Sequence, residues 1–358
     1  MRPALASTAS GGEVSPIRLM IVDDSTVARA VLSRMVEGDG GFQVAALAST
    51  AEGAIDALAH VSVDVILLDL EMPGAGGLKM LPRILEAAKG ARVIIVSSLA
   101  EEGAQVTVSA LALGAADTLP KPGIGRFNGK FSEVLLGKLR ALGSADQAQA
   151  ARQRGAALRA MGTEPMQCLA IGASTGGIHA LQQMFSALPA KLGVPVLVTQ
   201  HLPAAFMTVF ARQLGDAAQR RAMVAEDGMP LLRDVILVAP GDAHLTVENR
   251  GGKAVVRLDR RSAVSGCLPS VDPMLTSVAN FYGATGLGVI LSGMGRDGLL
   301  GAGRLVAAGG SLLAQDEATC AVWGMPKAVT DAGLASAVLP PTQIARRVAS
   351  RAGDHPWK

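Results

Sequence analysis

The chain has 358 residues, enough for two domains of ordinary size, and 49% of them are hydrophobic. A net charge of only +3, with one tyrosine and two tryptophans, argues against a basic, base-stacking surface for nucleic acid. The three cysteines are far apart, with no Cys-x-x-Cys pair and no Cys/His cluster, so neither a disulfide framework nor a zinc site is indicated, which fits a reducing cytoplasm. No run approaches the ~18 apolar residues that span a bilayer, so we expect no membrane insertion.

The first half of the sequence alternates between apolar strands and helical patterns. Residues 1–16 lack an apolar core and are predicted to be a disordered tail rather than a signal peptide. Between residues 17 and 142, non-alternating apolar runs such as 17–22, 63–68 and 93–96 are each followed by a helical pattern. Five such units predict an α/β domain whose doubly wound, mostly parallel sheet is covered on both faces.

Polar residues follow the strands of this half where each apolar run ends. Parallel strands finish at one edge of a sheet, so five side chains are expected to gather there: Asp23, Asp24, Asp69, Ser97 and Lys121. Three neighbouring carboxylates repel one another unless a cation joins them, and oxygen-only ligands suit Mg²⁺ completed by water and a phosphoryl oxygen. One aspartate alone would be a solvated loop residue, but recurrence at four strand ends favours a site.

This half of the chain resembles the response-regulator receiver domain, which has a flavodoxin-like fold. The resemblance implies that Asp69 is the phospho-acceptor and that a histidine kinase of the chemotaxis type is the phosphodonor. It also implies Mg²⁺ bound by Asp23, Asp24, Asp69 and the backbone carbonyl of Glu71, with Ser97 and Lys121 contacting the phosphoryl group.

Two positions depart from the receiver pattern. Thr118 stands where receivers usually carry an aromatic switch residue, three positions before the lysine. The stretch 75–77 is Ala-Gly-Gly, where Met-Asp-Gly is common. The phosphorylation chemistry should survive both changes, whereas the aromatic swing that reports it is not expected here.

Residues 143–165, rich in Ala, Gln, Ser and Gly, are predicted to be a linker, and residues 353–358 a tail. Between them, residues 166–352 are predicted to form a second α/β domain, again with a doubly wound, mostly parallel sheet. A hairpin made by residues 244–247 and 254–258 would be added to it.

The second half begins with a Gly-x-Ser-x-Gly pattern centred on Ser174. An apolar strand stops at Gly172, and an amphipathic helix starts at about residue 178. This is the spacing of a nucleophile elbow, in which a tight turn exposes the serine beside a helix N-terminus. A nucleotide-binding glycine loop would give the same local pattern, so the ten residues alone leave both interpretations open.

Two further residues could complete a catalytic triad with Ser174. His201 and Asp297 each follow a strong apolar strand through a Gly- or Pro-containing turn, so the same sheet edge would collect all three side chains. Imidazole can activate a serine, and a carboxylate can fix the imidazole. The residues also leave rivals open: four other histidines, with His179 the most credible base, and the aspartates Asp242, Asp272 and Asp316.

Residues 166–352 resemble the catalytic domain of the CheB chemotaxis methylesterases, a Rossmann-like α/β fold. Five motifs match in order: Ile171–Gly177, Thr199–Pro203, Ala239–Asp242, Pro269–Asp272 and Ser292–Gly298. The resemblance implies Ser174 as nucleophile, His201 as base and Asp297 as orienting acid. It places the oxyanion donors at the backbone N–H groups near Thr175 and Met294. One departure is Cys267-Leu268, where basic or histidine residues are expected, which leaves local substrate contacts open.

The resemblance as a whole implies a cytoplasmic protein-glutamate methylesterase and protein-glutamine deamidase. Its substrates would be methyl-accepting chemotaxis receptors, and phosphorylation of the receiver would activate it. No metal is expected at the catalytic site. Two alternatives remain from the residues: a response regulator whose output domain binds partners without catalysis, and one whose output domain binds DNA. Near-neutral charge and the absence of a helix-turn-helix pattern argue against the second.

Overall fold

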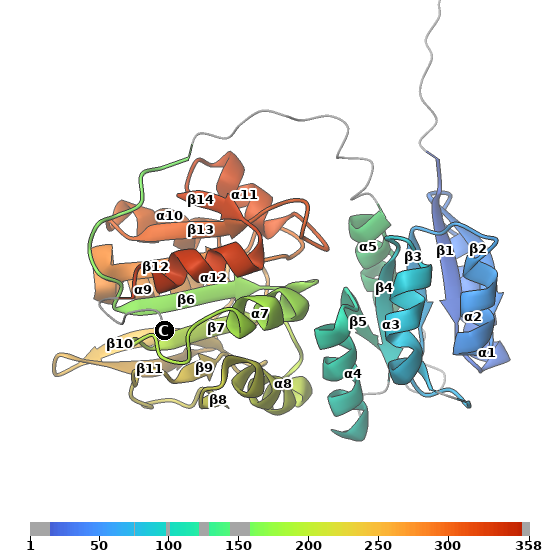
Figure 1. Cartoon of the computed structure of the whole chain (residues 1–358), viewed down its shortest axis with the longest axis horizontal. Coiled ribbons are helices and arrows are strands. Elements are labelled where there is room, and N and C mark those ends of the chain that lie inside the picture. The colour runs from blue at the N-terminus through green and yellow to red at the C-terminus, as the bar shows by residue number, and fades with distance from the viewer. Residues whose placement is uncertain (1–14, 75, 98–100, 122–128, 144–157, 353–358) are drawn as a thin grey trace, which may run out of the picture.

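The computed structural model describes residues 15–74, 76–97, 101–121, 129–143 and 158–352 (Figure 1). The predicted C-terminal tail, all but two residues of the predicted N-terminal tail, and residues 144–157 of the predicted linker lie outside this part of the chain. The domain boundaries therefore stay predictions, and the two sheets are described as they are observed.

The first sheet is fully parallel and has the strand order β2-β1-β3-β4-β5. Its strands are β1 (Ile17–Val22), β2 (Phe42–Ala48), β3 (Val65–Leu68), β4 (Arg92–Ser97) and β5 (Asp117–Pro120). The helices that follow them are α1 (Thr26–Glu37), α2 (Ala51–Leu58), α3 (Gly77–Ala87), α4 (Glu101–Leu113) and α5 (Gly129–Gly143).

Helices cover both faces of this sheet, as the uninterrupted apolar strands predicted. In β1, Leu19 and Ile21 pack in one cluster with Leu32 of α1 and Leu135 of α5. The alternate residue Met20 belongs to the cluster that contains α2, α3 and α4. Successive side chains of a strand point to opposite faces, so a strand buried on both sides must be apolar throughout.

The second sheet is also fully parallel, with the order β14-β13-β12-β6-β7-β9-β8. Its strands are β6 (Cys168–Ala173), β7 (Val196–Gln200), β8 (Ala222–Val224), β9 (Ile236–Val238), β12 (Gly286–Ile290), β13 (Ser311–Gln315) and β14 (Ala337–Leu339). The helices are α7 (Gly177–Ser186), α8 (Ala204–Ala218), α9 (Val271–Tyr282), α10 (Leu299–Ala307), α11 (Met325–Asp331) and α12 (Pro341–Ala349), with a 3₁₀ turn, η1 (Gly283–Thr285). The predicted fold class is confirmed for both halves.

The predicted hairpin is present and longer than expected. Strands β10 (His244–Arg250) and β11 (Lys253–Asp259) pair antiparallel over their full length, apart from the main sheet. Strands β8 and β14 and helix α11 were not predicted. The two strands have three residues each and lie at the sheet's edges, where they are too short to show a hydrophobic period.

Helices of the two halves pack against each other. Helix α4 packs against α7 and α8, and Figure 1 shows these three helices between the cyan and the green parts of the chain. Among the described helices, none has both the length and the apolar character needed to cross a bilayer.

Candidate active site and acidic cluster

Ser174 lies in a turn that glycines make possible. Gly176 has a φ of +75°, and a Cβ added there would lie 2.4 Å from Cβ of Ala321. The turn is held by two hydrogen bonds: the Ser174 N–H donates to the Ser292 carbonyl over 3.0 Å, and the Gln200 side chain donates to the Ser174 carbonyl over 2.9 Å. The nucleophile candidate is therefore fixed between β6 and the N-terminus of α7.

The structure brings Ser174, His201 and Asp297 together as a chain of contacts. Nδ1 of His201 lies 3.1 Å from Oγ of Ser174, and Nε2 lies 2.8 Å from Oδ2 of Asp297. In the neutral ring that catalysis requires, Nε2–H donates to Asp297 and Nδ1 accepts the Ser174 hydroxyl proton. The two ring nitrogens are thus exchanged relative to the trypsin-like triad, where Nε2 faces the serine.

This geometry follows from the strand order of the second sheet. The chain runs outward from β6 through β7 in one direction and later returns through β12 on the other side of β6. Ser174 follows β6, His201 follows β7 and Asp297 follows β12. Three adjacent parallel strands therefore deliver the three side chains to one edge, at the point where the sheet order reverses.

Asp297 is buried and held as a carboxylate by three donors. Besides His201, the hydroxyl of Ser270 donates to Oδ1 over 2.6 Å, and the backbone N–H of Val271 donates to Oδ2 over 2.7 Å. Burial opposes ionisation, but the hydrogen bonds from His201, Ser270 and Val271 hold the pKa of Asp297 well below its usual range. Both Ser270 and Val271 belong to the start of α9, whose N-terminus favours a negative charge.

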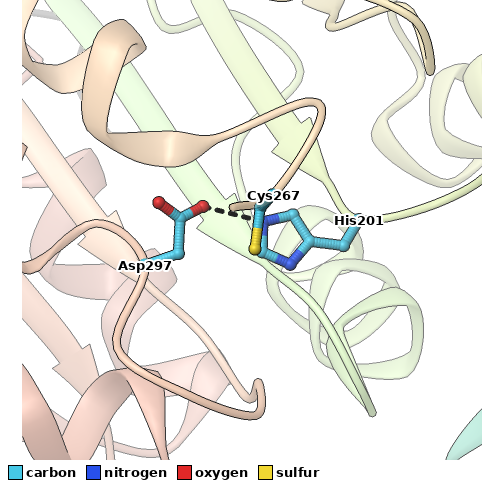
Figure 2. Close-up of side chains that lie close together, drawn as sticks. All are labelled: His201, Cys267 and Asp297. Carbon is cyan, nitrogen blue, oxygen red and sulfur yellow. Dashed lines mark hydrogen bonds and ion pairs between the residues drawn. The ribbon is translucent and has the colours of Figure 1, made fainter. Parts of the chain in front are cut away.

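The same pairing makes His201 a stronger base than a free imidazole. Burial of the ring disfavours its charged form, but the contact with Asp297, helped by Cys267, outweighs it and raises the pKa of His201 to about 9. Figure 2 shows the Cys267 sulfur beside the edge of the imidazole that faces the Asp297 carboxylate.

The expected oxyanion donors, Thr175 and Met294, lie in the loops that follow β6 and β12. Among the described residues, neither backbone N–H donates to another backbone or side-chain acceptor. The hydroxyl of Ser292 donates to the Thr175 carbonyl over 2.7 Å and so fixes the orientation of that turn. Two unengaged N–H groups are what a developing negative charge would need.

Five of the rival residues have other hydrogen-bonding or ionic partners, while His60 is exposed after α2 and His355 lies outside the described residues. His179 donates from Nδ1 to the Ala112 carbonyl over 3.0 Å, and its Nε2 lies 2.9 Å from the Gln183 amide nitrogen. His244 accepts from the Ser270 N–H and contacts the Arg261 carbonyl. Asp272 accepts from the Gly301 N–H, Asp242 pairs with Arg260, and Asp316 accepts from Thr319.

Sequence reasoning missed the role of Ser270 toward Asp297. Ser270 caps α9, because its side chain accepts from the Asp272 N–H. The second partner of that hydroxyl, 27 residues along the chain, has no local signature.

The first sheet gathers the predicted acidic cluster at its own edge. Carboxylate oxygens of Asp23, Asp24 and Asp69 lie within 4.8 Å of one another. Nζ of Lys121 lies 2.6 Å from Oδ2 of Asp69 and 3.0 Å from Oδ2 of Asp23. Burial raises the pKa of Asp69, although the Lys121 ammonium and the Glu71 N–H oppose the shift.

The donor set of this cluster fits Mg²⁺. Three carboxylates and one ammonium leave a net charge of −2, and the possible metal ligands of the three aspartates are all oxygen atoms, which Mg²⁺ prefers. Ser97 ends β4 opposite Pro120 of β5, one residue before Lys121. Thr118 lies buried within β5 at the position where an aromatic residue was expected.

Residues of the first sheet contact the Ser174 turn directly. The Thr175 hydroxyl donates to Oδ2 of Asp117 over 2.5 Å, and the Gly176 N–H donates to the Ala116 carbonyl over 2.6 Å. Oδ2 of Asp117 also accepts from Lys138, again over 2.5 Å. The start of β5 is therefore attached to the turn that carries the candidate nucleophile.

Two known protein families match this chain, one in each half. The family model described as CheB methylesterase matches residues 169–348, and the response regulator receiver domain matches residues 19–126. The chain belongs to the CheB methylesterase family. It is 44% identical to the "Protein-glutamate methylesterase/protein-glutamine glutaminase 2" of Caulobacter vibrioides, over 94% of this chain and 99% of that protein.

Other members of the family give the same result. A "Protein-glutamate methylesterase/protein-glutamine glutaminase 1" of Paramagnetospirillum magneticum is 40% identical over 92% of this chain and 94% of its own length. The crystal structure of the Thermotoga maritima CheB methylesterase catalytic domain superimposes with a TM-score of 0.51 at 35% identity. That structure covers 52% of this chain and 98% of its own.

Proposed function

We propose that this chain hydrolyses glutamyl methyl esters, and deamidates glutaminyl side chains, on methyl-accepting chemotaxis receptors. The observation that carries the proposal is the continuous contact from Ser174 through His201 to Asp297. Membership of the CheB family supports the substrate class, because its curated relatives carry both activities in their names.

The geometry supports acyl transfer through a covalent intermediate. Oγ of Ser174 attacks the γ-carbonyl carbon while Nδ1 of His201 takes the hydroxyl proton, and Asp297 stabilises the imidazolium that forms. The N–H groups of Thr175 and Met294 are assigned to the carbonyl oxygen as its charge develops.

Collapse of the tetrahedral intermediate expels the leaving group. Nδ1 of His201 returns its proton to the departing methoxide, and methanol leaves. Water then attacks the acyl-enzyme with the same imidazole as base, which restores the Ser174 hydroxyl and releases the glutamate. With a glutaminyl amide the steps are the same, and ammonia is the first product.

Substitution Ser174→Ala tests the assignment. Loss of the nucleophile of such a triad costs on the order of 10⁶ in kcat in a serine protease, so methanol release from methylated receptor membranes should nearly vanish. Ser186→Ala, an exposed position at the end of α7, is the matched control and should keep the wild-type rate. A Ser174→Ala chain that keeps a tenth of that rate would refute the proposal.

The receiver half is assigned to phosphorylation at Asp69 by a histidine kinase of the chemotaxis type. Asp23, Asp24, Asp69 and the carbonyl of Glu71 would hold Mg²⁺, which when bound offsets the negative charge of the carboxylates and of a phosphoryl oxygen. Lys121 and Ser97 are assigned to contact the phosphoryl group. Three free cysteines are consistent with a cytoplasmic location.

Regulation is assigned to the contact between the halves. The bonds from Asp117 and Ala116 to the Ser174 turn hold the residue whose N–H is assigned to the oxyanion, and α4 covers α7 and α8 beside it. Phosphorylation of Asp69 would shift this packing and raise the esterase rate. The rate of methanol release with and without a small-molecule phosphodonor tests it, and no increase would contradict this assignment.

A further inference from the structure

A cysteine lies against the catalytic pair at a position the esterase chemistry does not use. Cys267 belongs to the loop between β11 and α9 and replaces the basic or histidine residue expected there. Figure 2 shows its sulfur beside the imidazole of His201, on the ring's Asp297 side. One ligand atom each from His201, Cys267 and Asp297 lies within 4.8 Å of the others.

These three side chains form a donor set suited to a thiophilic metal ion. Zn²⁺ is bound by imidazole nitrogen, thiolate sulfur and carboxylate oxygen at about 2.0–2.3 Å, which in a tetrahedral site separates the ligand atoms by about 3.3–3.8 Å. The three ligand atoms now lie within 4.8 Å of one another and would move into that range when an ion binds. Three protein ligands would leave the fourth position for water.

Access and preorganisation also favour a bound ion. Cys267 is partly exposed and Leu268 beside it is 49% exposed, so solvent reaches the sulfur. Asp297 is fixed by Ser270 and Val271, which orient a ligating carboxylate in the way outer-shell partners do in metal sites. Cys168 and Cys320 are buried in the core, and burial raises the pKa of both thiols.

We propose that His201, Cys267 and Asp297 form an inhibitory site for a thiophilic divalent cation such as Zn²⁺ or Cd²⁺. The site overlaps the proposed esterase site and is distinct from the oxygen-only cluster at Asp69, which suits Mg²⁺. Thiolate and carboxylate together carry the two negative charges that balance the ion.

The inhibition follows from the proton balance at the imidazole. Metal–sulfur and metal–Nε2 bonds form, and the thiol proton passes to water. A charged ring also loses its Nε2 proton to water, whereas in a neutral ring the Nε2 proton is exchanged through water to Nδ1. The ring that remains is neutral and carries its one proton on Nδ1, which faces Ser174. That nitrogen then donates to Oγ and cannot take its proton, so the nucleophile loses its base.

A metal titration that does not depend on activity tests the site. Metal-free full-length protein, kept reduced and in excess Mg²⁺ to fill the Asp69 cluster, is titrated with Cd²⁺ while the ultraviolet thiolate-to-metal absorption is followed. We expect one such ion per chain, a parallel loss of methanol release, and full recovery with EDTA. Ser174→Ala should keep the absorption change, so a failed esterase assignment is distinguishable from a failed metal site.

Variants of the cysteine give the decisive comparison. In Cys267→Ser the absorption change should vanish, and the Cd²⁺ concentration that halves the variant's own metal-free rate should rise at least about tenfold, since even outer-shell losses weaken metal binding by 10–100-fold. Cys267→His should lose the absorption yet remain inhibited by Zn²⁺. Equal sensitivity of wild type and Cys267→Ser, or Cd²⁺ binding to the thiol without loss of activity, would overturn the proposal.

Discussion

Both sheets gather their candidate functional residues at the edge where the strand order reverses, but the charges at the two edges are balanced differently. In the first, the strand order reverses between β1 and β3, and the loops after these strands supply Asp23 and Asp69. In the second, it reverses between β6 and β12, whose loops supply Ser174 and Asp297. Both edges are crevices of the kind in which doubly wound sheets bind ligands.

The two edges differ in whether their polar side chains already have the partners that balance or bind them. The first gathers three carboxylates that, among the described residues, pair with the ammonium of Lys121, so a bound cation would stabilise it. In the second, every member of the Ser174–His201–Asp297 chain already has a partner within hydrogen-bonding distance. A site that is already assembled has to be regulated through access or through the turn that carries it, and the contacts of Asp117 and Ala116 lie on that turn.

The sharpest test of this contrast changes one carboxylate on each edge. Asp297→Asn should lower kcat by about 10⁴, because an amide stabilises the wrong imidazole tautomer. Asp69→Asn should instead abolish the increase in rate that a phosphodonor produces. The measurement is methanol release by both variants, with and without phosphodonor. The contrast between the edges would be wrong if Asp69→Asn lost the basal rate and Asp297→Asn lost only the activation.

A smaller effect is expected from the residue that positions the acid. Ser270→Ala removes a hydrogen bond to the Asp297 carboxylate worth about 1.5–3 kcal/mol, which corresponds to a fall in kcat of about 10- to 100-fold. Ser270→Thr keeps the hydroxyl and should restore most of the rate. Because Ser270 positions Asp297 without reaching substrate, KM should stay near the wild-type value; a change confined to KM would contradict this role.

The raised pKa of His201 predicts opposite pH trends for activity and stability. Only the neutral ring can accept the Ser174 proton, so kcat/KM should fall as the pH drops below about 9, not below 6.5. The folded-state pKa lies above the ordinary value. The ion pair's contribution to the free energy of unfolding is therefore full below 6.5 and is lost as the pH rises through about 9.

Two measurements check this pair of trends. The pH profile of kcat/KM locates the catalytic limb. Denaturant unfolding at pH 6 and pH 9.5, compared between wild type and His201→Gln, isolates the contribution of the imidazole to stability. A limb near 6.5, or a wild-type stability that falls no more than that of His201→Gln, would contradict the assignment.

The smallest effect is expected at the link between the two edges. Asp117→Asn weakens the bond to the Thr175 hydroxyl, and a neutral hydrogen bond contributes about 0.5–1.5 kcal/mol. The basal rate should therefore rise by a factor of about 2 to 10, with a smaller further increase on adding phosphodonor. Lys138→Gln removes the other partner of Asp117 and leaves the Thr175 bond, so it should not raise the basal rate.

The sequence predicted the parts of the sites that follow apolar strands. Ser174, His201 and Asp297 were identified because a buried parallel strand ends just before each turn, and the family resemblance singled them out from their rivals. The role of Ser270 was not predicted, because its hydrogen bond to Asp297 depends on how α9 packs beside the loop after β12. The Asp117 contact escaped for the same reason: it joins residues of separate sheets, and periodicity carries no information on such pairs.

Strand β5 has four residues and, among the described strands, pairs only with β4, so it forms the edge of its sheet. Asp117 is its first residue, and Lys121 follows its last, which puts the two about 13 Å apart at roughly 3.3 Å per residue. If Lys121 moved, β5 could shift along β4 as a unit and displace Asp117 at the Ser174 turn. The hydrogen bonds between β5 and β4 would oppose this shift. A displacement of this kind would not require an aromatic ring at position 118, where this chain has threonine.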